Sequence, residues 1–470
     1  MSFGVNVYLW GSKIGTVAQE NISSVPVFTY DKKFAKSGIQ LSPIMMPLSE
    51  RSYSFPSLNE ESFHKLPGLL SDSLPDKFGT KLISEYLARQ GRSIDDLTAI
   101  ERLCFTGSRG MGALEFRPEN GEHIPDQTID IDELANLANE ILSNREKLHI
   151  KTDHQAIAQL IKTGTSAGGA RAKALIAWNE NTGDIRSGQI NAGEGYSYWL
   201  LKFGTVSNNK DKDKDADDKE YQKIEYAYSL MTKDAGISMS DCRLIKSNEG
   251  LHFATKRFDR DEITGRKIHM QSLGAIAHFD FNDPGAHSYE EAAVIMRKIG
   301  LKQDSIEELF KRMVFNEVSK NYDDHVKNIS FLMDRKGTWT LSPAYDMTFS
   351  YNPTSIWTSK HQMTINGKRD YLTLDDLIRC GESMDISKNK IHKILQHIIS
   401  IVREWPQYAT YVGLSTQNTD YIKSYHKYND FYKEYSPFTP ALDRAKQEFP
   451  DAYAEIDKFA KSQFTEYTEK

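Results

Sequence analysis

The fold of this chain is decided by one polar stretch, Asn321-Tyr322-Asp323-Asp324-His325-Val326-Lys327-Asn328. Apolar runs stand on both sides of it, so its polar groups are expected to lie beside a buried core. Ionisable groups gathered in this way are typical of functional sites. A solvated polar loop is the alternative interpretation of the same stretch.

The spacing inside this stretch indicates phosphoryl transfer. That chemistry needs an acid that orients or deprotonates the attacking hydroxyl, together with an Asn and a second Asp that hold Mg²⁺ on the ATP phosphates. Protein kinases space the base and the metal-binding Asn as D-x-x-x-x-N. Asp323 and Asn328 have this spacing and Asp324 does not, which favours Asp323 as the base. We expect His325 to be a structural or nucleotide-contacting group, because Asp323 already takes the role of base.

The candidate for the second acid is Asp346, which ends Pro343-Ala344-Tyr345-Asp346. It lies 18 positions beyond Asn328, and strand-like segments at 329–333 and 339–341 lie between the two. A β-hairpin returns the chain to its starting point. We therefore expect a hairpin that brings Asp346 back beside Asn328.

The composition limits the class of protein. A chain of 470 residues, with 39% apolar and 26% charged residues, fits a soluble globular protein of two to four domains. A net charge of −6 argues against a chain that grips nucleic acid by itself. No apolar run approaches the roughly 18 residues that span a membrane, and the first residues do not resemble a secretion signal. Three widely spaced cysteines give no zinc pattern and favour a reducing compartment, so the cytoplasm is expected.

The pattern along the chain predicts an α+β fold in three parts. Residues 1–125 form a β-rich N-terminal subdomain, with a helix expected at about 76–92. Residues 126–262 contain a helix at about 130–144, a helix at about 221–235 and several strands, as in the N-lobe of a kinase. Residues 263–470 are mostly helical, apart from the predicted hairpin. The expected architecture is a protein-kinase-like two-lobe fold with a mainly helical C-terminal lobe.

A glycine-rich run, 164–174, precedes a strand-like segment. Because glycine has no Cβ, the backbone N–H groups of such a run can approach phosphate oxygens. The G-x-x-x-x-G-K-[ST] order of a Walker A loop is absent. A plain glycine-rich turn is the alternative, and the position of the run upstream of the acidic stretch favours a phosphate loop.

Lys202 lies in an apolar strand, Trp199-Leu200-Leu201-Lys202-Phe203. A lysine there is costly to bury without an anionic partner. ATP phosphates and an acidic residue on a neighbouring helix provide such partners in kinases. Glu225, on the helix that follows, is the expected acid. The alternative is a lysine that extends from an edge strand into water.

Two further segments allow two interpretations each. Phe258-Asp259-Arg260 ends a β-like strand and either joins the two lobes or forms a local Asp–Arg pair in a turn. The charged run 208–220 has no apolar anchor and predicts a solvated loop. That loop is either a tolerated surface insertion or a mobile element near the nucleotide.

Several of these pieces together resemble the HipA family of toxin-like serine/threonine kinases, in the family's order, from about residue 70 to 350. The matching pieces are Ser71-Asp72-Ser73-Leu74-Pro75-Asp76 with Gly79, Ser166 with Gly168-Gly169-Ala170-Arg171 and Lys173, Trp199-Leu200-Leu201-Lys202-Phe203, Arg257-Phe258-Asp259-Arg260, Asn321 with Asp323-Asp324-His325 and Lys327-Asn328, and Pro343-Ala344-Tyr345-Asp346. In this comparison Asp324 fills a position where Gly is sometimes found, and the 208–220 insertion is unusually long.

The resemblance implies a role for each site residue. Asp323 would be the catalytic base, and Asn328 with Asp346 would bind Mg²⁺. The ATP-binding residues would be Lys202 on the phosphates, Arg257 and Phe258 near the adenine hinge, His325 and Lys327 near the nucleotide, and Ser166, Gly168, Gly169, Ala170 and Lys173 in the phosphate loop. Ser166 matches a serine that such kinases can autophosphorylate, which would add about −1.5 to −2 charges beside the ATP site.

The resemblance also implies partners. The family pairs with a small helix-turn-helix antitoxin, similar to HipB, that binds operator DNA. An acidic chain would then reach DNA only through this antitoxin. Known targets in the family include aminoacyl-tRNA synthetases, and a membrane partner is not expected.

Three functions are therefore considered. The first is an ATP- and Mg²⁺-dependent serine/threonine kinase that acts as a toxin. The second is a small-molecule phosphotransferase of the aminoglycoside or choline type, which the β-rich module ahead of the kinase core argues against. The third is a non-catalytic, kinase-shaped corepressor that acts with the antitoxin.

Overall fold

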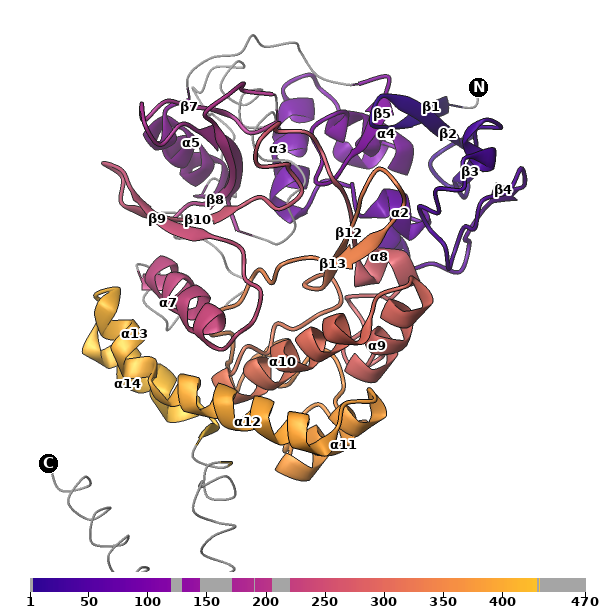
Figure 1. Ribbon diagram of the computed structural model, residues 1–470. Helices are drawn as coiled ribbons and strands as arrows, with labels where there is room; N and C mark the ends of the chain where they lie inside the picture. The colour runs from indigo at the N-terminus through magenta and orange to yellow at the C-terminus, as the bar shows by residue number, and fades with distance from the viewer. Residues whose placement is uncertain are drawn as a thin grey trace, which may run out of the picture.

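The computed structural model describes residues 3–119, 129–143, 171–189, 191–204, 220–428 and 431. Two β-rich parts lie side by side in it, and a helical part lies below both (Figure 1). The α+β composition predicted from the sequence is confirmed. The three-part division at 125 and 262 remains a prediction.

The N-terminal sheet has the order β4-β3-β2-β1-β5, and its paired strands are antiparallel. Alternate residues of the first strand, Val5, Val7 and Leu9, are buried, as expected for a sheet with one face on the core. Trp10 and Gly11 turn the chain with positive φ, the geometry of a tight hairpin. The strands are β1 (Phe3–Leu9), β2 (Ser12–Gln19), β3 (Val27–Tyr30), β4 (Ser52–Tyr53) and β5 (Leu114–Arg117).

Five α-helices of the described chain precede the second sheet. The two predicted at about 76–92 and 130–144 are found at Lys77–Ala88 and Ile131–Ser143. The Asp76 side chain begins the first of these by accepting the backbone N–H of Gly79 at 2.7 Å. The five helices are α1 (Glu60–Phe63), α2 (Gly68–Ser71), α3 (Lys77–Ala88), α4 (Ala99–Thr106) and α5 (Ile131–Ser143).

The second sheet has the order β7-β6-β8-β10-β9 and contains the strand with Lys202. Lys202 ends β8, directly opposite Lys173 of β6 on one side and Phe253 of β10 on the other. Helix α7 (Tyr221–Asp234) packs against β9 and β10. The strands are β6 (Lys173–Trp178), β7 (Ile185–Ser187), β8 (Ser197–Lys202), β9 (Cys242–Lys246) and β10 (Leu251–Lys256).

The predicted hairpin is present as β12 (Ser330–Met333) and β13 (Trp339–Leu341). A third strand, β11 (His269–Ser272), pairs with β12 and was not predicted. Because β11 is only four residues long and its partner lies far along the chain, no local pattern marks it.

The rest of the described chain after β11 is mostly helical, as predicted. Helix α10 lies at the centre of this part, packs against α12, and ends at Lys320, which has left-handed backbone geometry. Among the described helices, none is long and apolar enough to cross a bilayer. The helices are α8 (Leu273–Ala277), α9 (Tyr289–Lys298), α10 (Gln303–Ser319), α11 (Leu374–Ser383), α12 (Lys388–Arg403), α13 (Trp405–Tyr411) and α14 (Thr416–Tyr425).

The N-terminal part is joined to the helical part through α2 and α8. The Asp72 carboxylate accepts the backbone N–H of Ser272 at 2.7 Å and its hydroxyl at 2.9 Å. Gly68 begins α2 so close to Ala275 that a Cβ at position 68 would overlap the backbone carbonyl of Ala275. A side chain at position 68 is therefore incompatible with this contact.

We predict that Gly68→Ala destabilises the protein by about 2 kcal/mol, because overpacking a close backbone contact typically costs about 1–3 kcal/mol. Denaturant unfolding measures the change. The matched control is Gly4→Ala, whose added Cβ would lie 3.9 Å from Thr16, an ordinary contact. Equal stability of the two variants would show that the α2–α8 contact is not tight.

Candidate active site

The hairpin brings the two predicted metal-binding residues together. Asn328 and Asp346 line the same small cavity, which lies beneath the loop that follows α10. Asp324, His325 and Tyr345 also line it. The expectation that Asp346 returns beside Asn328 agrees with this geometry.

Asn328 closes the loop that contains Asp323. Its side-chain Nδ2 donates to the backbone carbonyl of Asp323 at 2.7 Å, and its backbone N–H donates to the carbonyl of His325 at 2.8 Å. This bond uses one of the two N–H groups of the side-chain amide and leaves Oδ1 available as an acceptor. The five-residue spacing therefore has a physical reason, because it lets Asn328 fix the backbone of Asp323.

The ammonium group of Lys202 connects β8 with helix α7 and with the segment after β13. Its Nζ lies 2.5 Å from the Glu225 carboxylate of α7 and also contacts the Asp346 carboxylate, which follows β13. Burial opposes the charged form of Lys202, but Asp346 and Glu225 outweigh burial and raise its pKa above the usual value. The expected partnership of Lys202 with Glu225 is therefore present.

Asp346 is held as a carboxylate in an unusual backbone geometry. Its φ of +53° lies in the left-handed region, which costs a residue with a Cβ about 1–3 kcal/mol and concentrates at functional sites. Burial favours the neutral acid, but Lys202 and, more weakly, Lys173 outweigh burial and lower the pKa of Asp346. The Asp323 carboxylate raises the pKa of Asp346, because the two negative charges repel each other.

Lys173 lies on the same face of the sheet as Lys202, because directly opposed residues of antiparallel strands point the same way. Its buried Nζ lies 2.9 Å from the Asp76 carboxylate, the same group that begins α3. The Ser71–Asp76 motif thus contacts both β-rich and helical parts, through Asp76 and Asp72. A phosphate contact of Lys173 remains a prediction.

Four predicted phosphate-loop residues, Ser166, Gly168, Gly169 and Ala170, lie outside the described residues. The charged run 208–220 also lies outside them, except for Glu220. The Glu220 carboxylate accepts the Ser415 hydroxyl at 2.6 Å, so this end of the run is fixed at the start of α14. For the rest of the charged run, both interpretations, a tolerated surface insertion or a mobile element near the nucleotide, stay open.

Arg257 and Phe258 have different surroundings. The buried Arg257 guanidinium donates two bonds of 2.8 Å to Asp259 and one of 3.0 Å to the Gly188 carbonyl. Asp259 also pairs with Arg260 at 2.8 Å. The side chains therefore form the local Asp–Arg pair considered above. The Phe258 ring packs 5.5 Å from the ring of Tyr345, the residue before Asp346. The predicted adenine contacts of Arg257 and Phe258 remain predictions.

His325 and Lys327 face Phe281. The Lys327 Nζ lies 4.2 Å from the Phe281 ring centroid, and the His325 ring lies 6.1 Å from it. Within the described part of the chain, buried His325 Nδ1 has no hydrogen-bond partner. These positions lie on the loop beside Asp323, and their proposed contacts with the nucleotide remain predictions.

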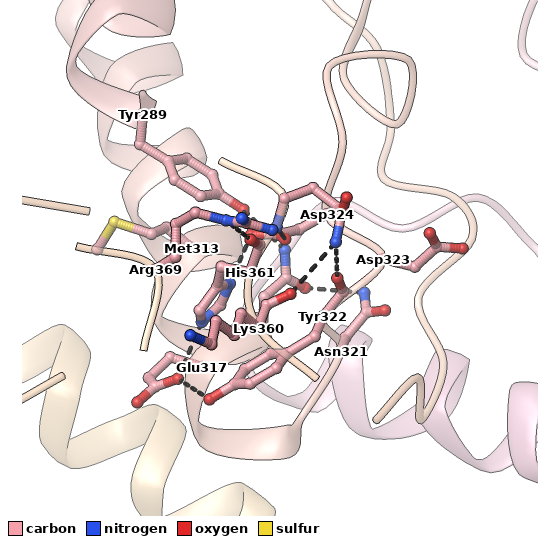
Figure 2. Close-up of polar contacts among 12 residues, drawn as sticks. Tyr289, Met313, Glu317, Asn321, Tyr322, Asp323, Asp324, Lys360, His361 and Arg369 are labelled. Carbon is pink, nitrogen blue, oxygen red and sulfur yellow. Dashed lines mark hydrogen bonds and ion pairs between the residues drawn. The ribbon is translucent and has the colours of Figure 1, made fainter. Parts of the chain in front are cut away.

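Asp324 is bound from three sides, which the sequence did not indicate. Its carboxylate accepts the Tyr289 hydroxyl at 2.8 Å and the Gln362 backbone N–H at 2.7 Å, and lies 2.6 Å from His361 Nδ1. Figure 2 shows this cluster, with the Asp323 carboxylate turned away from it. Asp324 is occupied by structural bonds, which supports Asp323 as the base. No spacing rule connects 324 with 361, so only the structure could reveal the pair.

Comparisons with known proteins bear on the family and the fold of the chain. A family model for the HipA N-terminal domain matches residues 5–117, and a model for the HipA-like C-terminal domain matches 165–405. The structure of HipA from Shewanella oneidensis MR-1, solved with HipB and operator DNA, covers 90% of this chain and 95% of its own at 16% identity and a TM-score of 0.63. This similarity confirms the predicted kinase-like fold. The Helicobacter pylori proinflammatory kinase CtkA covers 48% of this chain and 92% of its own at 11% identity, and its TM-score of 0.29 is too low to support an argument.

We predict that Lys202→Met destabilises the protein by about 3 kcal/mol, because it leaves the buried Glu225 carboxylate without its cation. The double variant Lys202→Met/Glu225→Gln should recover part of this loss. Denaturant midpoints of the wild type, both single variants and the double variant measure the coupling. Lys13→Met, at an exposed lysine of β2, is the control. Simple additivity of the two single changes would contradict the pairing.

Proposed function

The chain belongs to the HipA family, and we propose that it is an ATP- and Mg²⁺-dependent serine/threonine protein kinase that acts as the toxin of a toxin–antitoxin pair. One observation carries the proposal. The loop holding Asp323 is closed by Asn328, beside an Asp346 that is joined through Lys202 to Glu225. This set contains a candidate for each role that phosphoryl transfer requires.

Asp323 is proposed as the base that orients the substrate hydroxyl and accepts its proton. Its side chain is half-buried, and its backbone is fixed by Asn328. A base on a fixed backbone meets the geometric demand of general base catalysis, since the carboxylate must lie within hydrogen-bond reach of the hydroxyl. Asp324 cannot share this role while its carboxylate binds Tyr289, Gln362 and His361.

Asn328 and Asp346 fit a Mg²⁺ ion. Both offer oxygen, which this hard cation prefers, and kinase sites bind it through one or two side chains plus substrate phosphates and water. Among the described residues, no group of three or more His, Cys, Asp or Glu side chains is placed to hold a metal ion. When bound, Mg²⁺ neutralises charge on the phosphates. Asn328 Oδ1 and the Asp346 carboxylate would hold it.

Lys202 would hold the ATP phosphates. Its raised pKa keeps it charged at neutral pH, and Glu225 keeps the ammonium at the end of β8. Lys173, on the same face, and the run containing Ser166, Gly168, Gly169 and Ala170 are proposed to complete the phosphate site, with His325 and Lys327 nearby. Phe258 and Arg257 are proposed to lie near the adenine. Phosphorylation of Ser166 would place negative charge where phosphates bind and would inhibit the kinase.

The proposed partner is a helix-turn-helix antitoxin similar to HipB. The support is the S. oneidensis HipA, whose structure contains HipB and operator DNA. Because this chain has a net charge of −6, we propose that any contact with DNA is made through the antitoxin. We further propose a cytoplasmic target in translation, such as an aminoacyl-tRNA synthetase.

We predict that Asp323→Asn lowers phosphate transfer from ATP to protein by about 10²–10⁴-fold, the usual contribution of a positioned base. Folding should persist, since Asp and Asn are nearly equal in size. Labelled ATP, Mg²⁺ and cell lysate measure the transfer. The matched control is Asp304→Asn, at an exposed position near the start of α10, which should keep full activity.

The products separate the competing functions. Label on a metabolite instead of a polypeptide would indicate a small-molecule phosphotransferase. Absence of both transfer and Mg·ATP binding in the wild type, with repression still enhanced in the antitoxin's presence, would contradict the kinase proposal and leave the corepressor.

A further inference from the structure

The strongest unassigned feature is a buried imidazole beside the proposed base. His361 lies in the segment between β13 and α11 and is fully buried. Its Nδ1 lies 2.6 Å from the Asp324 carboxylate, and its Nε2 lies 2.9 Å from the Glu317 carboxylate of α10. A neutral imidazole has only one N–H. Because carboxylates accept hydrogen bonds on both sides, the ring must donate from both nitrogens and therefore carries a positive charge.

The side chains of the two residues that flank Asp323 in the sequence both bind within this cluster. Asp324, the next residue, binds His361 directly. Tyr322, the preceding residue, donates its hydroxyl to Glu317 at 2.6 Å, and its ring lies 4.1 Å from the His361 ring. The side chains on either side of Asp323 are thus fixed in one buried cluster, while the Asp323 carboxylate points away from it (Figure 2).

We propose that His361 is a positioning residue, whose ring bridges Glu317 and Asp324 and so holds Asp323 where it can accept the proton of the substrate hydroxyl. The inference rests on the proposed kinase function and adds a group to its site. Loss of the ring's second proton would break one of its two carboxylate bonds and leave two buried carboxylates facing a neutral ring. The loop between Tyr322 and Asp324 would then lose its fixed position.

The charge of the ring is supported by its surroundings. Burial opposes protonation, but Asp324 and Glu317 outweigh burial and raise the pKa of His361 to about 9. The same ring helps to lower the pKa of Glu317 to about 2, against the effect of burial. The ionisable groups facing the cluster are Glu317 and Lys320 of α10, Tyr322 and Asp324 of the loop, Tyr289 of α9, Arg369 and Asp370 of the segment after His361, and Lys427 after α14.

The sign of the pH effect follows from the raised pKa. His361 is charged below its folded pKa. At neutral pH its ring therefore binds both Glu317 and Asp324, and one of these two bonds is lost as pH rises through about 9. The rate constant for transfer should therefore have an alkaline limb near this value. A residue with only a packing role would give no such limb.

The test measures kcat against pH for the wild type and, by NMR of labelled histidines, the titration of His361. The two midpoints should coincide. Glu317→Gln removes one of the carboxylates and should move both midpoints to lower pH. His361→Gln should lower kcat at pH 7.5 by about 10–100-fold, the effect of displacing a catalytic group by about 1 Å, and should abolish the limb.

The control is His426→Gln. His426 is also buried in the helical part, where, among the residues that the structure describes, it contacts the Tyr228 hydroxyl at 2.8 Å and no carboxylate. The limb should therefore stay in place. A wild-type limb that is missing, or that differs from the His361 titration, would overturn the inference even if neither variant folds. Activity without such a limb leaves the kinase proposal intact, whereas absence of transfer at every pH refutes the kinase and this inference together.

Discussion

The site depends on the position of one ammonium, that of Lys202. The strand β8 brings it from the second sheet, α7 supplies Glu225, and the segment after β13 supplies Asp346. A buried cation between two carboxylates is stable only when all three are in place, since loss of one leaves an uncompensated charge. The pairing therefore fixes the β-rich part relative to the hairpin that carries Asp346, and it aligns the groups proposed to hold phosphate and metal.

A second buried cation between two carboxylates lies on the other side of Asp323. There the cation is His361, and its carboxylates are Glu317 and Asp324. Asn328 completes the arrangement from within the loop by binding the Asp323 carbonyl. Asp323 is thus supported by charge on one side and by a short-range hydrogen bond on the other, while its own carboxylate remains directed away from the cluster (Figure 2). Fully satisfied buried networks of this type specify a single geometry.

The sequence predicted those features that depend on short spacing or on burial of charge. The hairpin and the pairing of Lys202 with Glu225 are of this kind and have the expected geometry. The Asp323–Asn328 interval corresponds to a hydrogen bond from the Asn328 amide to the Asp323 carbonyl, and the roles of the two residues stay predictions. Features that depend on residues far apart were missed. The strand β11 and the His361 cluster have no local signature, because each needs a partner tens of residues away. For Phe258-Asp259-Arg260 the sequence left two interpretations open, and only the structure showed that Asp259 pairs with both Arg257 and Arg260.

A crystal structure with Mg²⁺ and a non-hydrolysable ATP analogue would show whether these residues form a nucleotide site. We expect Asn328 and Asp346 on the cation and Lys202 on phosphate oxygens, still paired with Glu225. This assignment also places Asp323 opposite the end of the γ-phosphate. A nucleotide bound elsewhere, or a cation that contacts neither Asn328 nor Asp346, would contradict it.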